Sequence, residues 1–281
     1  MKGKLSILIP TCNTLPFLKL SLNQFKKSKN VKNGKIELLV HVDGSTDGTV
    51  EWLKEEGYDF SHESWKGAYH SFNELWKRAT TEYITIMADD CIVCNDWDEA
   101  LLREIDSFPD ALLYPLFISA KFGKDPETFV LENFLQYADG IKEKRLMRGV
   151  GGFLTAKREL MIELDGYDEF YDPYGLGDRD FYYRLFTKYP SLNSFRIYDF
   201  ILYHLGSGAK RKIKKKVTWD MLKEKQINYF MAKNGISPGD EDKGLKGWNQ
   251  LSMRWSGGYW FTEEMRLEIA EQVKQSDTSS I

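Results

Sequence analysis

Three short apolar segments, each followed at once by polar residues, constrain the fold of this chain more than any other feature. Residues 5–9, 36–42 and 83–87 are mostly apolar runs of the length and composition typical of buried strands. Between these runs, residues 15–25 and 68–79 carry apolar side chains at helical spacing. Strands that alternate with helices predict an α/β fold with a mostly parallel sheet flanked by helices.

The polar residues that follow these strands are expected to meet in one place. Pro10 and Thr11 follow the first strand, Asp43 follows the second, and Asp89 and Asp90 follow the third. Ligands of parallel α/β sheets bind at the carboxyl ends of strands. Two adjacent carboxylates repel each other, and a hard divalent cation that also bridges a diphosphate would relieve the repulsion. Taken alone, the Asp pair is also compatible with a turn or a helix N-cap.

The second part of the chain continues the pattern of strands and helices. Strands are predicted near residues 111–117 and 195–203, and helices near 157–164 and 178–189. The charged residues 118–148 predict an insertion or a helical excursion.

Beyond His204 the composition of the chain changes. Residues 210–216 are strongly basic, residues 217–233 are predicted to be helical, and residues 262–274 are predicted to form a last helix. Residues 235–260, between these helices, are rich in Gly and Trp. We therefore expect a mainly helical carboxyl-terminal extension.

Charge and cysteine content exclude several classes of protein. The net charge of −3 indicates neither a nucleic-acid partner nor a membrane partner for the chain as a whole. Three cysteines, no signal peptide and no apolar run of the ~18 residues that cross a bilayer predict a cytoplasmic protein without a transmembrane segment. Cys91 and Cys94 lack a second ligand pair for zinc, so small buried cysteines are the favoured interpretation.

The apolar runs and their polar ends, taken together, resemble family 2 glycosyltransferases with the GT-A fold. The order and the spacing match, and the resemblance covers about residues 4–206. It implies a Rossmann-like sheet and an inverting transfer of a sugar from a nucleoside diphosphate sugar, with a UDP-sugar favoured. The segments that carry the resemblance are residues 6–13, 42–49, 83–90, 151–153, 164–169 and 175–184.

The resemblance also implies roles for individual residues. Asp178 corresponds to the general base, and Asp90 and His204 correspond to ligands of Mn²⁺ or Mg²⁺. A lone His after an apolar strand is more often a hydrogen-bonded structural residue, and only the pairing with the aspartate motif favours a metal ligand. Residues 1–100 are expected to bind the donor, 101–206 to hold the acceptor and the base, and 207–281 to form the extension. The donor is expected to contact Pro10, Thr11, Asn13, Asp43, Ser45 and Asp89.

Three positions depart from the pattern of that family. Ala88 stands where the first Asp of the Asp-x-Asp element is expected, which leaves fewer metal ligands, and Asp43 is a single carboxylate where many members have two. Gly177 replaces the usual Glu before Asp178. Asp178 and Asp180 are then both candidates for the base, and the alignment favours Asp178.

The acceptor is expected to be a saccharide or a glycoconjugate, and a polyanion such as modified DNA is an alternative. The basic run 210–216 is compatible with a solvated helix start, a lid over the diphosphate, or a contact with a polyanion or an anionic membrane. The Trp-rich segment could stack on a sugar or pack in a core. Candidate contacts with the acceptor or the diphosphate are Gly152, Asp180, Lys210, Lys212 and Trp255.

Two other functions are compatible with these features. A nucleotidyltransferase usually has a Gly-rich, basic loop after the first strand, whereas residues 10–15 here read Pro-Thr-Cys-Asn-Thr-Leu. A protein that has kept nucleotide or glycan recognition but lost turnover is favoured only by Ala88 and Gly177.

Overall fold

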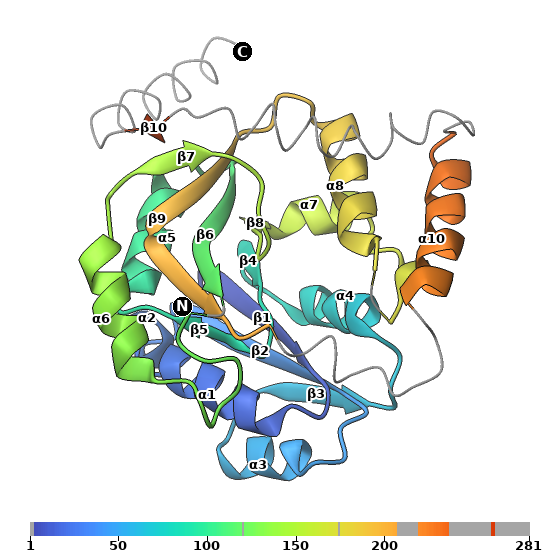
Figure 1. Cartoon of the computed structure of the whole chain (residues 1–281). Helices are drawn as coiled ribbons and strands as arrows, with labels where there is room; N and C mark the ends of the chain where they lie inside the picture. The colour runs from blue at the N-terminus through green and yellow to red at the C-terminus, as the bar shows by residue number, and fades with distance from the viewer. Residues whose placement is uncertain (1–2, 120, 174, 207–218, 236–259, 262–281) are drawn as a thin grey trace.

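The computed structural model describes residues 3–119, 121–173, 175–206, 219–235 and 260–261 of the chain. They form one ten-stranded sheet with helices on both faces (Figure 1). The strand order is β10-β7-β9-β6-β8-β4-β1-β2-β3, and β5 pairs with β9. The longest pairings are parallel, so the expected α/β fold with a mostly parallel sheet is confirmed.

The amino-terminal half consists of parallel strands joined by helices. β1 lies between β2 and β4, with Leu5 opposite both Ile36 and Tyr83. The strand β3 adds to the outer edge of β2. In chain order the elements are β1 (Leu5–Thr11), α1 (Leu15–Phe25), α2 (Lys29–Lys32), β2 (Ile36–Asp43), α3 (Thr49–Glu55), β3 (Phe60–Glu63), α4 (Ala68–Arg78) and β4 (Tyr83–Ile86).

The second half extends the sheet with strands of both directions. β8 runs antiparallel between β4 and β6, whereas β6 and β9 pair in parallel with a register shift between Pro115 and Leu116. A proline has no N–H to donate to a ladder, which agrees with a shift at this place. The elements are β5 (Cys91–Val93), α5 (Trp97–Ser107), β6 (Leu112–Ser119), α6 (Leu131–Ile141), β7 (Leu146–Arg148), β8 (Thr155–Lys157), α7 (Arg158–Glu163), η1 (Glu169–Tyr171), α8 (Gly177–Lys188), β9 (Ser194–His204), α10 (Trp219–Lys233) and β10 (Trp260–Phe261).

Two apolar layers hold the helices against the sheet. Along β1, Leu5, Ile7 and Ile9 face one layer and Leu8 faces the other, so this strand is buried on both sides. The first layer contains the apolar residues of α1, α3, α5 and α6. The second contains those of α4, α7, α8 and α10, with Phe230 and Met231 from the last of these.

The structure also bears on several smaller predictions made from the sequence. The chain between β6 and β7 contains the helix α6, in agreement with the expected helical excursion. Cys91 and Cys94 are buried and free, as the favoured interpretation of this pair requires. No helix among the described residues has both the length and the apolar character needed to cross a membrane. The helix predicted at 262–274 lies outside the described residues.

Candidate active site

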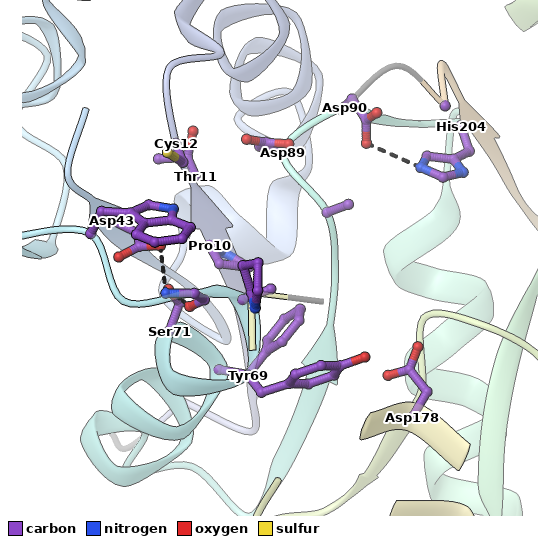
Figure 2. Close-up of a pocket in the computed structure, with 17 residues that line it drawn as sticks. Pro10, Thr11, Cys12, Asp43, Tyr69, Ser71, Asp89, Asp90, Asp178 and His204 are labelled. Atoms are coloured by element: carbon purple, nitrogen blue, oxygen red, sulfur yellow. Dashed lines mark hydrogen bonds and ion pairs between the residues drawn. The ribbon is translucent and has the colours of Figure 1, made fainter. Parts of the chain in front are cut away.

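A cavity of about 330 Å³ opens where β1, β2 and β4 end (Figure 2). The polar residues after all three strands line it, as the topology of a parallel sheet requires. Residues from α4, from the loop before α8 and from the end of β9 complete the wall. The lining residues are Pro10, Thr11, Cys12, Asp43, Trp65, Gly67, Ala68, Tyr69, Ser71, Phe72, Ala88, Asp89, Asp90, Pro173, Asp178, His204 and Gly206.

Asp43 joins the end of β2 to the start of α4. Its carboxylate accepts hydrogen bonds from the backbone N–H groups of Lys66 at 2.6 Å and Gly67 at 2.9 Å. Burial raises the pKa of Asp43, and the two N–H groups offset part of that rise. Each carboxylate oxygen keeps a further lone pair, so Asp43 can still accept a hydrogen bond from a ligand in the cavity.

Asp89 is held by the loop that follows β1. The hydroxyl of Thr14 donates a short hydrogen bond to Asp89 and lies 2.9 Å from the hydroxyl of Thr11. All three side chains are almost fully buried. The chain of hydrogen bonds fixes the end of β1 against the end of β4.

Asn13 and Ser45 connect two loops beside the cavity and do not line it. The N–H of Asn13 donates to Ser45 Oγ at 2.9 Å, and Asn13 Oδ1 accepts from the N–H of Thr46 at 2.8 Å. These bonds hold the loop after β1 to the loop after β2. The structure therefore places both residues next to the cavity but outside its lining.

Asp90 and His204 come together because β5 pairs with the end of β9. Residue 91 lies opposite residue 204 in this pairing, and His204 Nε2 is 3.2 Å from Asp90 Oδ1. Burial lowers the pKa of His204, but the Asp90 and Asp89 carboxylates more than compensate, and the pKa is raised. Figure 2 shows the pair at one end of the cavity.

The donor atoms of Asp90 and His204 suit a divalent cation. One atom each from Asp90, Cys91 and His204 lie within 4.8 Å of one another. Burial raises the pKa of the Cys91 thiol well above its usual value, so it stays protonated and is a poor ligand. A carboxylate and an imidazole remain, which are ligands that Mn²⁺ accepts. Ala88 lines the cavity beside them but has no ligand atom.

Asp178 faces the cavity from the first turn of α8. Its side chain is accessible to solvent from the cavity, yet the surrounding protein removes enough hydration to raise its pKa to about 6. Within the part of the chain that the structure describes, the carboxylate has no hydrogen-bond or ion-pair partner. A carboxyl group with these properties is suited to exchange a proton near neutral pH.

Asp180 lies two residues further along α8, but its side chain does not face the cavity. Its fully buried carboxylate is paired with Arg184 at 2.7 Å and Lys233 at 2.9 Å, and it does not line the cavity. Gly152 also lies outside the lining. Lys210, Lys212 and Trp255 lie outside the described residues.

Two aromatic residues of the cavity carry no signal in the sequence. Trp65, in the loop before α4, is 52% exposed and lines the wall near Asp43. Tyr69 lies in the first turn of α4, and Figure 2 shows its hydroxyl directed toward Asp178. Helical periodicity predicts only which face of α4 is buried, and it cannot separate a core aromatic residue from one that lines a cavity.

The chain matches one known family and the fold of several solved structures. Residues 6–164 match the model of the family described as glycosyl transferase family 2. No curated protein matches the chain.

Solved glycosyltransferase structures share the fold at low identity. S. aureus TarS in complex with UDP-GlcNAc gives a TM-score of 0.59 at 15% identity, over 90% of this chain and 73% of that one. S. aureus TarS 1-349 gives 0.55 at 16%, over 72% of this chain and 60% of that one. GalNAc-T7 with UDP, GalNAc and Mn²⁺ gives 0.55 at 13%, over 72% of this chain and 44% of that one. The chain thus covers 60% to 73% of TarS 1-349 in these two alignments and 44% of GalNAc-T7.

Proposed function

The chain belongs to glycosyl transferase family 2, and we propose that it transfers a sugar from a UDP-sugar to an acceptor hydroxyl group with inversion. The observation that carries this proposal is the single cavity in which Asp43, Asp89, Asp90, Asp178 and His204 meet. Complexes of the structural neighbour TarS with UDP and with UDP-GlcNAc support the choice of donor.

The donor would occupy the part of the cavity formed by the ends of β1 and β2. Asp43 accepts hydrogen bonds there, and Pro10, Thr11 and the exposed ring of Trp65 form the surrounding wall. A nucleobase has an extended π-face, and stacking on an aromatic side chain contributes about 1–3 kcal/mol. We assign the nucleoside to this end, and the diphosphate to the end that contains Asp90 and His204.

The reaction requires a base for the acceptor and positive charge for the leaving group. Asp178 takes the proton of the acceptor hydroxyl as the oxygen forms its bond to the anomeric carbon. The bond from that carbon to the diphosphate oxygen breaks, and its electron pair leaves with the diphosphate. Asp90 and His204 would hold a Mn²⁺ or Mg²⁺ ion, which when bound neutralises the charge on the diphosphate. One displacement of this kind inverts the configuration and needs no nucleophilic carboxylate.

The acceptor side of the proposal rests on chemistry alone. We expect a saccharide or a glycoconjugate, because the base needs only a hydroxyl group to deprotonate. A polyanion such as modified DNA remains the alternative, and the basic residues that favour it, Lys210 and Lys212, lie outside the described residues.

A thermal-shift panel of nucleoside diphosphates and their sugars, with and without Mn²⁺, tests the proposed function. A ligand at about 100 times its dissociation constant stabilises a protein by about 2.7 kcal/mol, which is easily measured. We expect UDP or a UDP-sugar to stabilise the chain, and release of UDP on incubation with acceptors. Stabilisation without any sugar release would instead indicate a non-catalytic binder. No stabilisation by any nucleotide would contradict the proposal.

Truncating Trp65 should weaken nucleotide binding. We expect Trp65→Ala to raise the Kd for UDP about 10-fold, because the base loses its stacking surface. Trp65→Phe keeps a ring at this position and should stay within about 3-fold of the unmodified protein. Isothermal titration of UDP in the presence of Mn²⁺ measures both variants. Equal affinity of the Ala variant and the unmodified chain would show that the nucleoside lies elsewhere.

The activity should depend on pH through Asp178. Since the raised pKa of about 6 belongs to a group that must be ionised to act as a base, kcat should fall about 10-fold per pH unit below 6 and level off above it. Burial also raises the pKa of Asp172 to about 6, but its carboxylate accepts hydrogen bonds from the N–H groups of Tyr69 and His70. The acidic limb should therefore persist in Asp172→Asn, and its loss there would assign the limb to Asp172.

A further inference from the structure

The loop that leads into α8, and so to Asp178, is held on two sides by side chains from distant parts of the sequence. On one side, the Tyr69 hydroxyl of α4 donates to the carbonyl of Gly175 at 3.0 Å and accepts from its N–H at 3.2 Å. On the other side, Gln226 of α10 donates to the carbonyl of Tyr171 at 3.0 Å and accepts from the N–H of Leu176 at 3.0 Å. We call these two side chains the Tyr69–Gln226 clamp.

Gly175 in this loop and Gly177 at the start of α8 leave the space that the clamp occupies. Gly175 has φ +145°, and a Cβ there would lie within 3.0 Å of the Gln226 side chain. A Cβ at Gly177 would lie within 3.0 Å of ring carbons of Tyr69. Tyr69 and Gln226 are 5% and 1% exposed, so neither can move aside cheaply. The missing Glu at position 177 therefore has a physical reason: the Tyr69 ring fills the place of any side chain there.

The helix α10 is fixed to the same region at further points. Lys233 pairs with Asp168 at 2.7 Å and with Asp180 at 2.9 Å. Tyr229 stacks on Phe170 with ring centroids 3.7 Å apart and donates to Asp168 at 2.8 Å. These contacts attach α10 to the segment before α8 and to α8 itself, so the position of Gln226 is well determined.

The Asp178 carboxylate has no partner of its own in the described part of the chain, so its orientation depends on the backbone at the start of α8, which follows directly from this loop. We propose that Tyr69 and Gln226 are positioning residues, which set the direction of the Asp178 carboxylate by holding the backbone at Tyr171, Gly175 and Leu176. The helix α10 is then a working part of the active site, although it lies beyond the residues that match the family. This inference rests on the proposed role of Asp178 as the base.

Two substitutions that keep the packing test the proposal. Tyr69→Phe removes both hydrogen bonds to Gly175 but leaves the ring against Gly177. Gln226→Leu keeps a similar volume and removes the bonds to residues 171 and 176. A displacement of about 1 Å at a reacting group can cost about 100-fold in rate. We expect kcat to fall 10- to 100-fold in each variant, while the KM for the donor and the Kd for UDP change less than 2-fold.

Tyr229→Phe provides the matched control on the same helix. It also removes one hydroxyl hydrogen bond, to Asp168, but it keeps the ring that packs on Phe170 and Tyr171 and leaves the hydrogen bonds of Tyr69 and Gln226 in place. We expect its kcat to stay within 2-fold of the unmodified chain, even where its melting temperature falls as much as that of Tyr69→Phe. If the Tyr69 and Gln226 variants lose only thermal stability and keep kcat, the clamp is structural and the inference is wrong.

Asp178→Asn separates this outcome from a failure of the proposed function. Loss of turnover in Asp178→Asn together with unchanged kcat in both clamp variants would overturn the inference and leave the function intact. Unchanged turnover in Asp178→Asn would remove the premise, and with it both proposals. If Gln226→Leu does not fold, Tyr69→Phe still decides the matter, because phenylalanine is accommodated in the same apolar layer.

Discussion

Replacing Asp178 by asparagine should lower kcat by about 10²- to 10⁴-fold and leave the melting temperature unchanged or higher. The amide cannot take the proton of the acceptor hydroxyl, so the rate falls. The effect on stability follows from the raised pKa: the folded state disfavours the ionised carboxyl group at neutral pH, and the substitution removes that charge. Initial rates of UDP release and a thermal melt at pH 7 measure the two effects.

Asp180→Asn provides the comparison, because it lies on the same helix and should behave in the opposite way. Its buried carboxylate is paired with Arg184 and Lys233, and breaking a buried pair by removing one partner costs about 3–5 kcal/mol. We expect a clear fall in melting temperature and a smaller loss of kcat than in Asp178→Asn. If Asp180→Asn were the more damaging variant for kcat at a temperature where both are folded, Asp180 would be the better candidate for the base.

The sheet, and the convergence of polar residues at the carboxyl ends of its strands, could be predicted from the sequence. Both follow from the local alternation of apolar strand segments, helical segments and polar turns. Residues 5–9 are apolar except for Ser6, as expected of a strand buried on both faces, and the parallel order brings Thr11, Asp43 and Asp89 to one edge. β3 was not predicted, because Phe60–Glu63 is a half-exposed edge strand without an apolar run. The three-residue strands β5, β7 and β8 are too short to leave a pattern.

The environment of each candidate residue depends on contacts that no local pattern contains. The choice between Asp178 and Asp180 stayed open in the sequence, whereas in the structure Asp180 is paired with Lys233, which lies 53 residues away. In the sequence, Gly177 appears only as the loss of a carboxylate. In the structure, the Tyr69 ring occupies the space that a side chain at position 177 would need. Contacts between residues so far apart in the sequence can be identified only in the folded chain. They include the contacts that attach α10 to α8 and to the segment before it.

Replacing Asp90 by asparagine should remove the effect of divalent metal on nucleotide binding and lower turnover about 100-fold or more. Asp90 is the only carboxylate among the three described ligand candidates near His204, and a bound metal contributes several kcal/mol to stabilising the leaving group. We expect Mn²⁺ to increase the thermal shift caused by UDP in the unmodified chain and to have no effect in Asp90→Asn. Turnover with and without EDTA gives the second measurement.

Cys91→Ala is the matched control for this site, since its sulfur is the third atom of the same group. The thiol is fully buried and its pKa is raised, so it should not bind Mn²⁺, and the variant should keep the full metal response. If Cys91→Ala loses that response as completely as Asp90→Asn, the thiol is a ligand after all, and a softer metal than Mn²⁺ belongs at the site. If EDTA leaves the unmodified chain fully active, fixed donors stabilise the diphosphate and the metal proposal is wrong. In that case His204, whose pKa the neighbouring carboxylates raise, is the candidate to supply positive charge at this end of the cavity.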